Sequence, residues 1–151
     1  MATQHRSRRA LAATKRRMHD ADAVEELHDD VSEFAPVALA VDDEPLIRQF
    51  VSAVLRHRGW SVIEAADGTV ALTVAPPALD LLATDYEMPV FTGVTLAERL
   101  REQDEDLPVL MVSGDPDVAR KMRSLYGRRT ALVPKPFPVE ALVSSIGSII
   151  D

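Results

Sequence analysis

The sequence predicts an α/β fold in which helices cover both faces of a parallel β-sheet. Apolar runs of four or five residues recur along the chain, and helix-like stretches separate them. Runs this short, without polar alternation, are typical of strands that are buried on both faces. The clearest runs are VALAV (37–41), LLAT (81–84), VLMV (109–112) and ALVP (131–134).

The alternation of strands and helices begins after Pro36. Acidic residues and Pro45 follow the strand 37–41 and favour the start of a helix. Apolar residues then repeat at helical spacing up to Gly59, a typical helix end. We expect a second strand over 61–64 and a short helix over about 69–75, which Pro76 and Pro77 terminate. The residues at helical spacing are Leu46, Ile47, Phe50, Val51, Val54 and Leu55.

The second half of the chain continues the same pattern. After the strand 81–84 we expect a loop over 85–92 and a helix over 94–103, and Pro108 introduces the strand 109–112. Asp115 and Pro116 predict the N-cap and first residue of the next helix. The strand 131–134 precedes a final helix that begins at Pro138. Its predicted inward residues are Val139, Leu142, Val143, Ile146 and either Ile149 or Ile150.

Composition excludes several classes of protein. The chain has 151 residues, a net charge of −7 and no cysteine. A length of this size predicts one domain with a real core. The negative charge argues against general nucleic-acid binding, and no apolar stretch approaches the roughly 18 residues that a bilayer span needs. The lack of cysteine is compatible with a reducing compartment, so we expect a cytoplasmic protein without membrane insertion.

Residues 1–35 fall outside the strand and helix pattern and form a predicted N-terminal extension. Residues 1–17 are basic and contain no acid, whereas residues 20–33 carry seven acids. An apolar stripe at helical spacing consists of Val24, Leu27, Val31 and Phe34. We favour a disordered or partly helical tail, and a helix that docks on the domain or on a partner, or that self-associates, is the alternative.

Chemically active side chains follow the predicted strands where each strand ends. They are Asp42 and Asp43, Asp85, Ser113 and Lys135. Ligands bind outside the carboxyl ends of parallel strands, so these groups should converge at one rim. Like carboxylates ~4 Å apart repel by about 4 kcal/mol at an effective dielectric constant of about 20. Oxygen ligands without histidine or cysteine therefore predict Mg²⁺, and a lysine and a hydroxyl opposite it suit a phosphoryl group.

Residues 36–150 resemble the receiver domain of two-component response regulators. The resemblance rests on motifs in the family's order at the strand ends, since each residue alone could be a helix cap, a turn residue or a solvated charge. The motifs are VDDEP (41–45), DYEMPVFTG (85–93), VSG (112–114) and PKPF (134–137).

The resemblance implies a flavodoxin-like (βα)5 doubly wound sheet with strand order 2-1-3-4-5, over residues 36–151. It implies that Asp85 accepts a phosphoryl group from a phosphohistidine donor. Asp43 and Asp85 would bind Mg²⁺ directly, Asp42 largely through water, and the backbone carbonyl of Glu87 would complete the set. Lys135 would pair with the phosphoryl group beside a cis Lys135-Pro136 bond, and Ser113 would act as the switch hydroxyl.

The resemblance also implies partners. The donor would be a histidine kinase or a histidine phosphotransfer protein. A downstream protein would bind the face made by the fourth helix, the fifth strand and the fifth helix of the domain. Where the family often has an aromatic residue, three positions before the lysine, this chain has Leu132, so the usual aromatic relay is missing. We expect a single-domain regulator without an output domain, acting as a switch or as a phosphorelay shuttle.

Two other functions are considered. A phosphohydrolase of the haloacid dehalogenase type also uses an Asp nucleophile and Mg²⁺, but its D-x-D motif after the first strand is missing here. A receiver-like module that binds partners without phosphorylation is the second alternative, and Leu132 is its best support. We expect no enzyme activity beyond slow self-phosphorylation and hydrolysis of the phosphorylated Asp85. A cluster around the fourth helix, suited to an acidic partner or simply solvated, comprises Arg120, Lys121, Arg123, Arg128 and Arg129.

Overall fold

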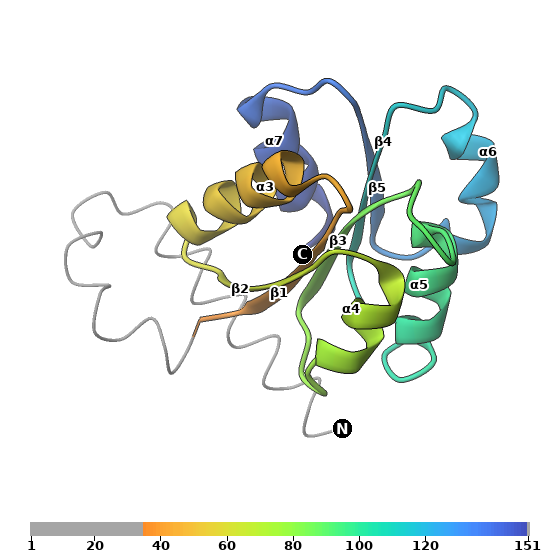
Figure 1. Cartoon of the computed structure of the whole chain (residues 1–151), viewed down its shortest axis with the longest axis horizontal. Helices are drawn as coiled ribbons and strands as arrows, with labels where there is room; N and C mark the ends of the chain where they lie inside the picture. The colour runs from red at the N-terminus through yellow and green to blue at the C-terminus, as the bar shows by residue number, and fades with distance from the viewer. Residues whose placement is uncertain (1–34, 151) are drawn as a thin grey trace.

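A computed structural model of the chain describes residues 35–150, in which five parallel strands form a single sheet (Figure 1). The strand order is β2-β1-β3-β4-β5, as the family resemblance implies. Every pairing is parallel, and each connection between strands crosses over through a helical segment. The strands are β1 (Val37–Val41), β2 (Ser61–Ala65), β3 (Leu81–Asp85), β4 (Val109–Ser113) and β5 (Thr130–Pro134).

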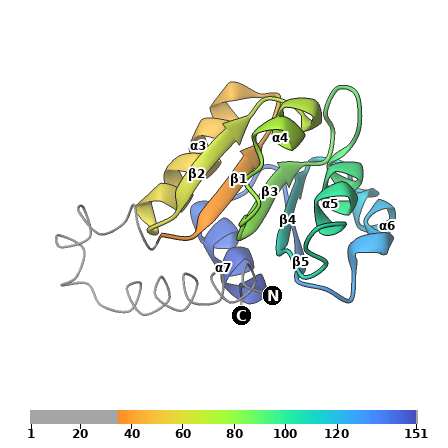
Figure 2. The ribbon, with the colours of Figure 1, turned by 90° about the horizontal axis from the view of Figure 1, so that it is seen from below.

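Helices cover both faces of the sheet (Figure 2). One face packs against α3 (Pro45–His57) and α7 (Val139–Ile149). The other packs against α4 (Gly68–Val74), α5 (Gly93–Arg101) and the short α6 (Val118–Lys121), which continues into the 3-10 turn η2 (Arg123–Leu125). None of the helices in residues 35–150 combines the length and apolar character needed to cross a bilayer.

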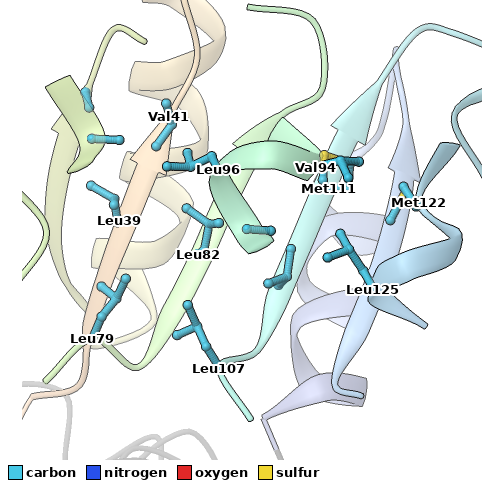
Figure 3. Close-up of a cluster of buried hydrophobic side chains, with 14 of the residues drawn as sticks. Leu39, Val41, Leu79, Leu82, Val94, Leu96, Leu107, Met111, Met122 and Leu125 are labelled. Carbon is cyan, nitrogen blue, oxygen red and sulfur yellow. The ribbon is translucent and has the colours of Figure 1, made fainter. Parts of the chain in front are cut away.

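The core forms two apolar clusters, one on each face of the sheet. The cluster beneath α4, α5 and α6 is shown in Figure 3, where Leu39, Leu82 and Met111 point from neighbouring strands toward the helices. The opposite cluster contains Trp60, which is 2% exposed and precedes β2. Burial of both strand faces explains why these strands appear in the sequence as continuous apolar runs.

Two details of the sequence prediction are wrong. The helix predicted to start at Asp115 and Pro116 begins at Val118, with Asp117 at its N-cap position; residues 115–117 form a turn in which the Asp115 carboxylate accepts a hydrogen bond from the Asp117 amide. Val139, predicted to point inward, is 39% exposed in the first turn of α7. The prediction for residues 1–34 lies outside the described residues.

Candidate functional site

The strand ends bring Asp42, Asp85, Ser113 and Lys135 to one rim of the sheet. Asp85 and Ser113 are the last residues of β3 and β4, while Asp42 and Lys135 directly follow β1 and β5. Parallel register places these ends side by side. The sequence therefore predicted this convergence correctly. The Lys135-Pro136 bond is cis, as the resemblance implies.

Lys135 is the centre of a charged cluster. Its Nζ lies 3.2 Å from Asp42 Oδ2, 3.4 Å from Asp85 Oδ1 and 3.6 Å from Glu44 Oε1. Burial lowers the pKa of Lys135, but the nearby carboxylates of Asp85 and Asp42 outweigh this effect, so its pKa is raised. The amine is thus held in its charged form beside the carboxylates.

Both aspartates in contact with Lys135 are buried, and this costs energy. Asp42 is 4% exposed and Asp85 is 5% exposed. Burial raises the pKa of both carboxyl groups; that of Asp85 reaches about 6, with the charge of Asp42 as a second cause. Lys135 opposes the shift without cancelling it. The site therefore holds more negative charge than its single lysine neutralises, which favours a bound cation.

An open cleft of about 460 Å³ lies over Asp85. Within the described residues, one carboxylate oxygen each of Asp42, Glu44 and Asp85 lies within 4.8 Å of the other two, and the three could hold a metal ion. Asp43, predicted as a direct ligand, is exposed and lies outside this group, although it lines the cleft. Glu44 was not predicted as a metal ligand, although its position directly after Asp42 and Asp43 in the sequence could have indicated it. The cleft is lined by Asp43, Glu44, Asp85, Glu87, Met88, Pro89, Gly114 and Lys135.

The loop after β1 is fixed by hydrogen bonds at Asp42. Its Oδ1 accepts from the Glu44 amide at 2.9 Å, and its backbone carbonyl accepts from Arg48 Nη1 at 2.8 Å. Arg48 in turn lies 3.5 Å from the carboxylate of Glu64 on β2. Arg48 thereby ties the acidic loop to the neighbouring strand, a positioning role that the sequence did not reveal.

The backbone around Asp85 is held tightly. The Asp85 carbonyl oxygen accepts from the Thr84 hydroxyl at 2.9 Å, and the Gly93 amide donates to the Tyr86 carbonyl at 2.9 Å. A Cβ on Gly93 would lie only 2.3 Å from the Asp85 carbonyl oxygen. Only glycine fits there, because α5 begins against the end of β3. The loop that lines the cleft thus starts and ends at fixed points.

Ser113 is linked to a set of contacts on the β4–α6 loop. Its side chain is buried, and Oγ accepts from the Asp115 amide at 2.9 Å. Asp115 pairs with Lys121 at 2.6 Å, and Lys121 lies over the Tyr86 ring, 5.4 Å from its centroid. Movement of the Ser113 hydroxyl would therefore disturb this loop. Leu132, on the path expected for a relay, is a partly buried residue of the α4–α5–α6 cluster.

Arg101 is a buried cation that the sequence analysis missed. It is 6% exposed at the end of α5, and its guanidinium donates to the carbonyls of Leu107, Leu125 and Arg129 and to the Thr130 hydroxyl. These bonds tie α5 to η2 and to the start of β5. No sequence signal marks such a residue, because its main partners are backbone carbonyls, which every residue has.

The sequence of the chain matches a known protein family. The family model of the response regulator receiver domain matches residues 38–147. The probable transcriptional regulatory protein TcrX of Mycobacterium tuberculosis is 31% identical over 113 residues, covering 74% of this chain and 48% of the relative. Response regulator MprA of Mycobacterium leprae is 34% identical over 113 residues, covering 74% and 50%. The chain thus spans about half the length of these curated relatives.

Solved structures give the same result. The chemotaxis response regulator CheY4 of Vibrio cholerae matches with a TM-score of 0.65 and 30% identity, covering 76% of this chain and 98% of that one. The receiver domain of the hybrid histidine kinase CckA matches with a TM-score of 0.63 and 31% identity, covering 76% and 99%. Neither alternative function, phosphohydrolase or phosphorylation-independent module, is favoured by these matches. The chain belongs to the response regulator receiver domain family of two-component signalling proteins.

Proposed function

We propose that the chain accepts a phosphoryl group on Asp85 from a phosphohistidine of a histidine kinase or a histidine phosphotransfer protein. The observation that carries this proposal is the environment of Asp85: a buried carboxylate at the end of β3, beside Lys135 at 3.4 Å and open to a cleft. A carboxylate oxygen attacks phosphorus, the P–N bond breaks, and the imidazole leaves with its electron pair and takes up a proton. Asp85 becomes an acyl phosphate.

The donor set of the cleft fits Mg²⁺. All candidate ligands are oxygens, the kind that hard divalent ions prefer, and together they exceed the charge of Lys135. We assign the ion to Asp43, Asp85, the Glu87 carbonyl and, largely through water, Asp42, with Glu44 as a further donor in the cluster. When bound, Mg²⁺ neutralises the charge that builds on the transferring phosphoryl group.

The residues of the chain divide the remaining work. Lys135 pairs with the phosphoryl oxygens once Asp85 no longer carries a free carboxylate. Arg48 holds the Asp42 loop in position through the Asp42 carbonyl. Ser113 donates its hydroxyl hydrogen to a phosphoryl oxygen, which pulls on the loop that includes Asp115. The outcome is a phosphorylation-controlled surface near α6 and β5 that a downstream protein reads, or a phosphoryl group held for onward transfer.

The test uses acetyl phosphate and Mg²⁺, with intact-mass measurement of the protein. We expect a single phosphoryl adduct on the wild type, lost at alkaline pH, and none on Asp85→Asn. Asp67→Asn is the matched control, because Asp67 follows β2 at the edge of the sheet and caps α4 outside the site. An adduct that persists in Asp85→Asn, or a folded wild type that forms none, would refute the proposal.

A further inference from the structure

Positive charge gathers at one edge of a protein whose net charge is −7. No Asp or Glu occurs between Asp117 and Glu140, whereas this stretch carries six Lys and Arg residues, Lys135 included. The cations lie on α6, on η2 and in the turn that leads into β5, the edge strand of the sheet (Figure 1). We call this surface the basic edge, and it comprises Arg120, Lys121, Arg123, Arg128 and Arg129.

The basic edge is incompletely neutralised within the domain. Arg120 and Arg128 are 68% and 48% exposed, and they approach Asp117 and Glu105 only at 3.6 and 3.9 Å. Arg123 and Arg129 make no ion pair with another described residue. Lys121 alone has a close partner, Asp115. Such a surface attracts an acidic ligand, and its attraction is long-ranged at low salt.

The chain carries a segment of opposite charge next to the domain. Residues 25–33 read EELHDDVSE, with five acids and no Lys or Arg. We call them the acidic segment. It ends three residues before Pro36, at the start of β1, and is separated from the basic residues 1–17 by more of the chain than from the domain. Its five negative charges equal in number the five positive charges of the basic edge.

The strand register shows that the acidic segment can reach the basic edge. Leu39 pairs with Leu82, Leu82 with Val109, and Val109 with Thr130. Thr130 is therefore three strand spacings from Leu39, about 14 Å. Asp29 is seven residues before Pro36, a reach of roughly 23 Å when extended. A tether this short gives an effective concentration of about a millimolar, so a weak contact suffices.

We propose that the acidic segment, residues 25–33, binds the basic edge of its own chain. The contact neutralises arginines that the domain leaves without partners and covers the edge strand β5. Since α6 and β5 belong to the face expected to contact a downstream protein, the acidic segment competes with that protein. The inference does not depend on phosphorylation of Asp85, because both charges are present in the unmodified chain.

Paramagnetic broadening in the full chain tests this contact. The chain lacks cysteine, so a spin label on His28→Cys is unique and leaves the acids in place. At low salt we expect the amide signals of residues 118–130 to lose intensity about twofold or more relative to the reduced label. In ~1 M salt, where the screening length is about 3 Å, the signals should recover.

Two charge variants separate this contact from a tail that merely stays near its attachment point. Arg123→Gln/Arg129→Gln should abolish the broadening. Arg56→Gln/Arg58→Gln removes the same number of cations at the end of α3, near Pro36 on the β2 side, and should leave it unchanged. Equal broadening in all three proteins, or loss in the second variant alone, overturns the proposal. Broadening that appears on ¹⁵N-labelled chains only when unlabelled spin-labelled chains are mixed in would assign the contact to a second copy and also overturn it.

Discussion

Replacement of Asp85 by asparagine should stabilise the metal-free protein. The pKa of the buried Asp85 carboxyl is raised from 3.8 to about 6, because burial and the charge of Asp42 outweigh the attraction of Lys135. One pKa unit corresponds to about 1.4 kcal/mol, so the ionised side chain costs the folded state up to about 3 kcal/mol at neutral pH. Asparagine has nearly the same shape and carries no charge. We therefore expect Asp85→Asn to raise the free energy of unfolding by roughly 1–3 kcal/mol.

The pH dependence of this gain has a definite sign. The pKa of Asp85 in the folded state lies above its value in the unfolded state. The free energy of unfolding of the wild type therefore falls as Asp85 ionises between pH 3.8 and about 6, and the fall is complete above that range. The advantage of Asp85→Asn should be largest at pH 7.5 and should shrink as pH falls through the same range. Urea unfolding in EDTA, followed by circular dichroism, measures both values.

Asp43→Asn is the control for this prediction, because Asp43 is exposed at the same rim, and its substitution should change stability by less than about 0.5 kcal/mol. Saturating Mg²⁺ should reduce the difference in the free energy of unfolding between the wild type and Asp85→Asn, because an ion that binds only the folded wild type stabilises that protein. A lower stability of Asp85→Asn than of the wild type in EDTA at pH 7.5 would show that burial does not destabilise the ionised carboxylate of Asp85.

Three further substitutions test the scaffold of the site. Arg101→Met should destabilise the fold by about 3 kcal/mol, because it leaves buried carbonyls without donors, whereas Arg99→Met at an exposed position should cost little in thermal unfolding. Gly93→Ala should lower the free energy of unfolding in urea by about 2 kcal/mol and slow phosphorylation by acetyl phosphate, because the new Cβ would press on the Asp85 carbonyl. Unchanged stability in this variant would contradict the close approach of Gly93 to that carbonyl. Ser113→Ala should lower the free energy of unfolding by about 1 kcal/mol, because the Asp115 amide loses its acceptor, and the variant should still be phosphorylated. The NMR shift changes of the α6 amides that accompany phosphorylation should disappear in Ser113→Ala and persist in Ser113→Thr.

The sequence predicted the strand ends well because burial on both sheet faces leaves a direct mark on composition. Residues 37–41, 81–84 and 109–112 are apolar for that reason, and the polar residue after each run had to lie at the rim. The convergence of Asp85 and Lys135 at this rim followed from their positions after the strands, whereas their roles in phosphoryl transfer are what the family resemblance implies.

Features that depend on partners distant in the sequence could not be predicted from the sequence. Arg101 is indistinguishable in the sequence from the exposed Arg99, because only the fold brings the Leu107 and Leu125 carbonyls to its guanidinium. The predicted start of α6 lay too early, because an Asp carboxylate that accepts from the amide two residues on occurs both at a helix N-cap and in a turn before a helix, and the sequence does not distinguish the two.

The identity of the modified side chain is the most direct test of the central claim. Sodium borohydride reduces an acyl phosphate to an alcohol, so a phosphorylated aspartate becomes homoserine and can be located by peptide mass spectrometry. After treatment with acetyl phosphate, Mg²⁺ and then borohydride, we predict homoserine at residue 85, with Asp42, Asp43 and Glu44 unchanged. Homoserine at Asp42 or Asp43, or an unmodified Asp85 in protein that carries a phosphoryl group, would contradict the assignment of Asp85 as the phosphoacceptor.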